Sequence, residues 1–329
     1  IFSYIQVGIP LKKNWGLSFG LRPVSRISYK INKAELLSGS GGPVDSMITQ
    51  FNGSGGSFLP TIGTGFSIGR LSAGVNMGYL FGRREISTRR AFINDSVSYY
   101  ASNSANNSSF GGLFFNAGLQ YRIDLKNNKF LRLGLAGNWE QTLSGTRDVL
   151  RQTYTLGASG ETLQIDSVFA QNDIAGEVVY PASYTAGFLF GDDAKDLKFG
   201  VDYTTSKWSN YRYFGQKDSV QNSWKLAAGG QYRPKPGKGY FSNVAYRFGF
   251  SFGQDYIRVN DDLPTFGLSV GAALPIRINR TALNQINAVN LSFEFNKRGN
   301  QQNVLRENIY RLSLGFNLTD LWFIKRKYD

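Results

Sequence analysis

The chain has 329 residues, of which 41% are hydrophobic and 15% aromatic, and its formal net charge is +14. It contains neither cysteine nor histidine. Their absence excludes disulfides and thiol nucleophiles, and it removes the commonest general base and transition-metal ligand. The composition therefore argues against an enzyme, and we expect no catalytic residues, no metal site and no cofactor.

The basic excess does not indicate nucleic-acid binding, because the basic residues are spread over many turns and loops. Cations at strand ends beside anionic lipid explain the charge as well. No stretch approaches the ~20 uninterrupted apolar residues of a membrane-spanning helix. A membrane protein built from strands stays open, because only alternate residues of a barrel strand face lipid.

Apolar residues alternate with glycine or polar residues along most of the chain, as in strands with one apolar face. In 73–81, for example, Val75 and Met77 alternate with Gly74 and Asn76. In chain order we predict thirteen strands, with boundaries good to ~2 to 4 residues, over 2–11, 15–31, 57–69, 72–92, 110–125, 129–143, 179–190, 196–213, 222–233, 240–255, 264–276, 287–299 and 306–319.

The connections between these segments favour a membrane barrel over a soluble β-sandwich. Short turns at 12–14, 69–70 and 126–128 alternate with long polar excursions at 93–108, 144–178 and 254–263. Outer-membrane barrels have short turns on the periplasmic side and long loops outside. Aromatic residues near the strand ends are expected to form the interface girdle: Trp15, Trp208, Trp224, Tyr240 and Trp322.

Charged side chains on the small or polar face are the candidates for lining the lumen. An ionised group inside a narrow lumen needs a partner or water, so these residues form either structural ion pairs or a substrate path. They are Arg122, Arg132, Glu140, Lys198, Asp202, Lys225, Arg247, Glu294 and Arg311.

Two further motifs have simple interpretations. The pattern Gly-x-Ser-x-Gly occurs four times, but without histidine no base activates the serine, so we interpret it as a lumen face of small residues. Arg83, Arg84, Arg89 and Arg90 lie at the outer end of one strand. Their guanidinium groups either bind lipopolysaccharide phosphates or form a solvated rim.

The predicted strand count is odd, whereas single-chain bacterial barrels have an even number of strands with both termini in the periplasm. The first segment leads into a short turn and must run towards the periplasm. We therefore expect about fourteen strands in a single barrel domain over 1–329, with one upstream strand and an N-terminal hatch before Ile1.

Several short motifs in order resemble the FadL-like family of outer-membrane transporters in its Bacteroidota form. They lie at 16–23, 53–56, 180–184, 202–203 with Trp208, 246–249, 271–275 and 321–327. The resemblance implies a fourteen-strand barrel with an internal hatch, and passage of apolar ligands through the wall. Candidates for the wall kink are Gly53, Gly55, Gly56 and Pro181. The Asn-Pro-Ala motif of the family's hatch has no counterpart here, since the chain contains no Asn-Pro pair.

Two functions are compatible with these patterns. The leading hypothesis is a passive conduit for small hydrophobic molecules in the bacterial outer membrane. The alternative is an accessory barrel of a multiprotein secretion, assembly or nutrient-uptake complex. The expected partners are the lipid bilayer, lipopolysaccharide, a hydrophobic small molecule and other outer-membrane proteins. An apolar pocket in the lumen would favour transport, and a lumen filled by Arg and Glu pairs would favour the subunit.

Overall fold

The computed structural model describes residues 4–37, 45–93, 100–156, 162–235, 239–276 and 287–317. No helix in these ranges is long and apolar enough to cross a membrane. The elements are β1 (Ile5–Lys12), β2 (Trp15–Leu37), β3 (Asp45–Ile68), β4 (Leu71–Ile93), β5 (Ala101–Leu125), β6 (Lys129–Asn138), β7 (Gln141–Leu156), β8 (Thr162–Tyr180), β9 (Ser183–Asp192), β10 (Leu197–Ser206), η1 (Trp208–Asn210), β11 (Arg212–Tyr213), β12 (Gln216–Lys217), β13 (Ser223–Tyr232), η2 (Tyr240–Asn243), β14 (Ala245–Val259), β15 (Asp261–Ile276), β16 (Asn287–Arg298) and β17 (Glu307–Asn317).

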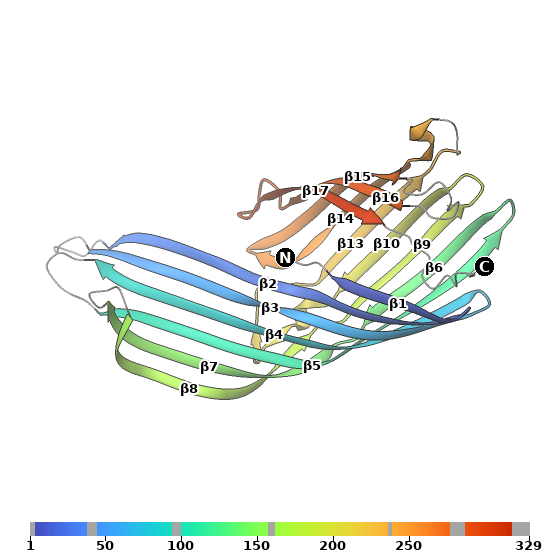
Figure 1. Ribbon diagram of the computed structural model, residues 1–329. Helices are drawn as coiled ribbons and strands as arrows, with labels where there is room; N and C mark the ends of the chain where they lie inside the picture. The colour runs from blue at the N-terminus through green and yellow to red at the C-terminus, as the bar shows by residue number, and fades with distance from the viewer. Residues whose placement is uncertain are drawn as a thin grey trace, which may run out of the picture.

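The strands form one antiparallel sheet in which each crossing of the wall pairs with the next crossing along the chain (Figure 1). Some crossings of the sheet consist of two elements. β6 and β7 both pair with β5, and β9 and β8 pair with them in turn. Likewise β11 extends β10, and β12 extends β13. The described elements therefore make thirteen crossings, which confirms the predicted all-β barrel architecture.

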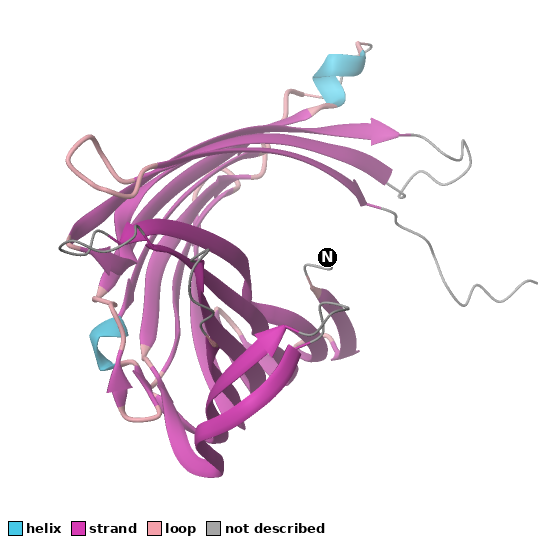
Figure 2. Cartoon of the chain, turned by 90° about the vertical axis from the view of Figure 1, so that its left-hand side faces the viewer, coloured by secondary structure: helices cyan, strands magenta, loops and turns pink. Residues whose placement is uncertain are grey.

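The sheet curls around a central space, and its two ends stay apart (Figure 2). Among the described residues, β1 pairs only with β2 and β17 only with β16. Because neighbours alternate in direction, the first and the thirteenth crossing run the same way. The two unpaired edges are thus parallel to each other.

The two faces of the wall differ as the alternation predicts. On β4, Val75, Met77 and Tyr79 point outward and are exposed, whereas Gly74 and Asn76 point into the lumen. The apolar side chains have no protein layer to cover them, so this face suits contact with lipid. The lumen face of small and polar residues suits contact with water.

Strands β2 to β5 are 23 to 25 residues long, about twice the 9–11 residues that cross a bilayer. With β7 and β8 they continue past the barrel as an extension, which we call the arm (Figure 1). On β4 the arm covers 82–93, about 40 Å at ~3.3 Å per residue. The expectation of long polar excursions at 93–108, 144–178 and 254–263 was wrong for much of these ranges, because β5, β7, β8, β14 and β15 run through them. Strand pairing continues in the arm, although the regular alternation of apolar with small residues seen on the barrel wall is lost there.

The sheet bends where the arm leaves the barrel. Gly55 and Gly56 lie within β3 and have φ angles of 136° and 153°. A Cβ on Gly55 would overlap the Arg83 carbonyl oxygen, and one on Gly56 would approach that of Ser25. On the neighbouring strand the register shifts between Pro23 and Ser25. Only glycine fits this bend.

Candidate functional site

An apolar cluster occupies the lumen at the level where the arm begins. Its side chains come from the inner faces of β3, β4, β5, β7 and β8, and one comes from β11. The buried members are Leu59, Leu80, Phe114, Leu143, Val178 and Tyr213. Leu143 is 0% exposed and Leu59 is 1% exposed, so the cluster forms a tightly packed apolar patch on this side of the lumen.

The short hairpin β11–β12 folds inward and completes the cluster. Its turn contains Phe214 and Gly215, with φ angles of 50° and 75°. The Tyr213 and Ser108 hydroxyls lie 2.5 Å apart in a hydrogen bond. The Phe214 ring lies against Gly176, where a Cβ would overlap it. The hairpin is thus seated in a fitted position on the wall.

Arginine side chains stack on the aromatic rings of the hairpin. The Arg84 guanidinium carbon lies 3.7 Å from the Tyr213 ring centroid, and that of Arg147 lies 5.2 Å from the Phe214 ring. Burial raises the pKa of Tyr211 to about 12, and the positive charge of Arg84 partly opposes this shift. The Tyr211 phenol is therefore neutral, and cation–π contacts of Arg84 and Arg147 stabilise the hairpin against the wall.

The backbone ladder of the wall is interrupted beside this cluster. The register of β5 with β6 ends at the pair Ala117 and Gly137. The register of β5 with β7 begins only at the pair Gly111 and Ser144. Along the next crossing, β8 ends at Tyr180 and β9 begins at Ser183, so neighbouring crossings are broken together.

One side chain bridges the interruption. The Gln141 Oε1 accepts a hydrogen bond from the Phe115 N–H at 2.6 Å, and its Nε2 donates to the Phe115 carbonyl at 3.1 Å. Phe114 and Leu143 lie on the lumen side of this bridge. On the outer side Phe115 stacks on Trp139, with ring centroids 5.8 Å apart. At the Gln141 side-chain amide the wall is therefore apolar on both its lumen face and its outer face.

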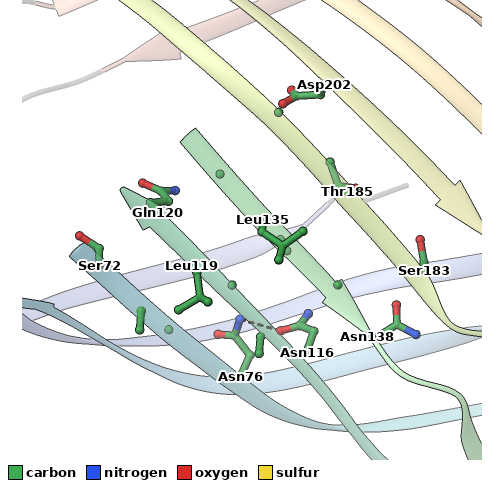
Figure 3. Close-up of a pocket in the computed structure, with 18 residues that line it drawn as sticks. Ser72, Asn76, Asn116, Leu119, Gln120, Leu135, Asn138, Ser183, Thr185 and Asp202 are labelled. Carbon is green, nitrogen blue, oxygen red and sulfur yellow. Dashed lines mark hydrogen bonds between the residues drawn. The ribbon is translucent and has the colours of Figure 1, made fainter. Parts of the chain in front are cut away.

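On the side of the short turns, the lumen contains a polar cavity of about 690 Å³ (Figure 3). The Asn76 amide donates a 2.8 Å hydrogen bond to the Asn116 carbonyl oxygen. Polar side chains from five strands line this cavity, including Asn76, Asn116, Gln120, Asn138, Thr185 and Asp202. The lumen thus has an apolar cluster at one level and an open cavity lined by small and polar residues at the other.

The predicted lumen charges mostly have local partners. Glu294 and Arg311 form a cross-strand ion pair at 3.3 Å. Arg122 contacts Asp124 at 2.7 Å, and Lys198 lies 4.0 Å from Asp196.

The other members of this set are more dispersed. Arg247 donates to Gln231 and Asn290, and Glu140 accepts from Asn210. The Arg132 guanidinium lies 5.9 Å from the Phe130 ring centroid. Asp202 lines the cavity and Lys225 lies on β13. The structure therefore does not bring the nine charges together into one site.

The predicted girdle residues occupy different surroundings. Trp15 begins β2 and stacks on Phe66, and Trp224 stacks on Tyr203. Trp208 lies in η1, where it contacts rings of the hairpin region and of β14.

The remaining predicted girdle and kink residues are placed as follows. Tyr240 lies in η2 against Phe241, and Trp322 lies outside the described residues. Of the wall-kink candidates, Gly53 lies in β3 against the Tyr29 ring. Pro181 is fully buried between β8 and β9.

The curled antiparallel wall, apolar outside and polar inside, defines a transmembrane β-barrel, and solved structures of FadL-like channels have a similar fold. The structure of CymD, described as a monoaromatic hydrocarbon channel, matches with a TM-score of 0.55 at 14% identity, covering 94% of this chain and 81% of that one. A Pseudomonas aeruginosa FadL homologue matches with a TM-score of 0.54 at 12% identity, covering 90% and 69%. The family model described as BamG matches residues 1–329, and the chain therefore belongs to the BamG family. A comparison with curated proteins gave no match.

Proposed function

We propose that this barrel is a passive conduit for small hydrophobic molecules in the bacterial outer membrane, of the FadL-like type found in Bacteroidota, and that it has no enzymatic activity. The observation that carries the proposal is the wall at Gln141. It is apolar on its lumen side through Phe114 and Leu143, and apolar on its lipid side through Phe115 and Trp139.

A hydrophobic solute gains little by entering the polar cavity, whose lining would have to give up hydrogen bonds to water. The apolar cluster offers it a favourable environment instead. Over residues 112–116 of β5 no ladder with β6 or β7 is described, and Gln141 makes hydrogen bonds to the Phe115 backbone there. Rotation of that one side chain would join the cluster to the lipid, so the solute could leave sideways.

The test measures uptake of N-phenyl-1-naphthylamine and toluene into vesicles with a lipopolysaccharide outer leaflet. The protein is expected to accelerate uptake. Gln141→Ala should accelerate it several-fold further, and Leu143→Asn should slow it by making the path polar. Thr142→Ala, at an exposed neighbouring position, is the matched control. Uptake no faster than in vesicles holding an unrelated barrel would refute the conduit.

We further infer that one more strand lies between β17 and β1. Unpaired backbone groups are not tolerated in lipid, and the two free edges are parallel, so an odd number of additional strands restores an antiparallel barrel. A single strand N-terminal to Ile1, as expected from the sequence together with a hatch, satisfies this requirement.

The arm favours the second candidate, an accessory barrel of a larger outer-membrane complex. A sheet that extends about 40 Å beyond the bilayer, at ~3.3 Å per residue, offers a large surface to other outer-membrane proteins. Native mass spectrometry after gentle extraction distinguishes the two functions. A lone barrel with an apolar ligand supports the conduit, and stoichiometric partner chains support the subunit.

A further inference from the structure

The outer face of the wall changes character sharply where the arm begins. On β4 the outward side chains Met77, Tyr79 and Phe81 are followed, in the same alternation, by Arg83 and Glu85. Because the side-chain period of a strand is two, these residues share one face. The change from apolar to charged therefore marks the level of the lipid headgroups.

The same change occurs on the neighbouring strands. On β3, outward Phe58 is followed by Ser54 and Asn52, and on β2, outward Phe19 is followed by Arg26 and Lys30. The register aligns these positions across three strands. The headgroup level is thus occupied by a continuous polar band of side chains.

Cations dominate this band. Arg26 and Arg83 flank Gly56 in one row of the register, so no side chain separates their guanidinium groups. Lys30 and Arg89 lie further along the same face. All four are exposed. Cations spaced around a gap can contact a phosphate from more than one side.

The adjoining surface can hydrogen-bond to hydroxyl groups. Glu85 is held by an ion pair with Arg83 at 2.6 Å and by the Ser54 hydroxyl at 3.0 Å. Beside it lies an open cavity of about 520 Å³, whose outward polar lining consists of Ser28, Lys30, Asn52, Ser54, Ser87 and Asn107. Hydroxyl, amide and carboxylate groups around a depression suit a sugar ring.

From these features we infer that the outer face at the base of the arm binds the phosphorylated sugar headgroup of lipopolysaccharide, with phosphate on Arg26, Lys30, Arg83 and Arg89 and sugar in the adjoining cavity. The inference rests on the proposed position in the outer membrane. Of the four arginines expected to bind phosphate, it retains Arg83 and Arg89. Arg84 does not contribute, because its guanidinium group stacks on the Tyr213 ring inside the barrel.

The test compares two double variants of equal charge change on the same two strands. Lys30→Ala with Arg89→Ala removes cations from the outer face, and Lys33→Ala with Arg90→Ala removes them from the opposite face. Binding of phosphorylated lipopolysaccharide to the purified barrel in detergent is measured by native mass spectrometry. Dephosphorylated lipopolysaccharide and inorganic phosphate are the comparison ligands.

We expect the outer-face pair to bind lipopolysaccharide about tenfold more weakly, as for the loss of two solvent-exposed ion pairs, and the opposite-face pair to bind normally. Dephosphorylated lipopolysaccharide should bind weakly to every variant. An equal loss in both pairs, no loss in either, or competition by inorganic phosphate at the concentration of the glycolipid would overturn the inference. Hydrocarbon uptake by the outer-face pair should stay normal, so failure of this inference is distinguishable from failure of the conduit.

Discussion

Gln141 pairs with the backbone of Phe115 as a neighbouring strand would, accepting from its N–H at 2.6 Å and donating to its carbonyl at 3.1 Å. The amide supplies both halves of a ladder contact that β6 and β7 do not make. A side chain can rotate away from such a contact at much lower cost than a strand can separate.

Replacing Gln141 should destabilise the barrel, because the Phe115 backbone groups lose their partner. We expect Gln141→Ala to lower the free energy of unfolding by about 2 to 4 kcal/mol, from two unsatisfied groups at ~1 to 3 kcal/mol each. Urea unfolding in detergent measures this change. Gln141→Glu should also destabilise at neutral pH, since a carboxylate cannot donate to the carbonyl. Thr142→Ala within about 0.5 kcal/mol of the parent is the control, and a similar loss there would contradict the bridging role.

The bend below the arm should not tolerate a side chain. Gly55→Ala would place a Cβ on the Arg83 carbonyl at a φ of 136°. We predict a loss of about 1 to 3 kcal/mol in unfolding free energy. Gly134→Ala, whose Cβ would meet nothing within 4 Å, should cost much less. Equal stability of the two variants would mean that the bend is not fixed by glycine.

The lipid face should reject charge at mid-wall. Leu133 lies between Tyr121 and Phe188 in the register and is exposed. In lipid vesicles Leu133→Arg should destabilise the folded barrel by about 2 to 4 kcal/mol. The adjacent Gly134→Ala faces the lumen and serves as the comparison. If both substitutions are tolerated equally, the assignment of the two faces fails.

The β11–β12 hairpin can pack against the wall only because Gly176 leaves room for the Phe214 ring. In Gly176→Ala the new Cβ would overlap that ring, so the hairpin should lift and expose the cluster. Because the chain has no cysteine, a single Leu143→Cys reports on exposure through its rate of maleimide labelling. We expect at least about tenfold faster labelling with Gly176→Ala, since ~1.4 kcal/mol changes an opening equilibrium tenfold. Unchanged labelling would show that the hairpin does not cover the cluster.

The barrel wall could be predicted from the sequence because lipid imposes a two-residue alternation on each crossing, as at Val75 and Met77. The arm was predicted only in part: the predicted strand over 72–92 covers most of β4, but the arm segments of β5, β7 and β8 were expected to be polar excursions, because the apolar alternation disappears where both faces of the sheet meet polar surroundings. Gly53 to Gly56 were expected before a strand, yet they lie inside β3. The reason is that these glycines serve a bend rather than a turn.

The candidate site was predicted only in part. The small and polar lumen face followed from the alternation, but the apolar cluster did not, because its members come from six strands with no common spacing. Tyr213 enters it through a hairpin whose signal, Phe214 followed by Gly215, is only two residues long. Gln141 bridges the wall by a hydrogen bond to Phe115, which lies 26 positions away in the chain. A local sequence pattern does not predict such a contact.

The strictly sequential pairing of the sheet bears on how the protein assembles. Neighbouring crossings are neighbours in the chain from β1 to β17, so each hairpin closes a short loop and loses little chain entropy. Strand pairing can therefore propagate along the chain from whichever hairpin forms first. Closing the barrel between the first and last crossings is the step that joins distant parts of the chain. We expect this closure to be the rate-limiting step of insertion into the membrane.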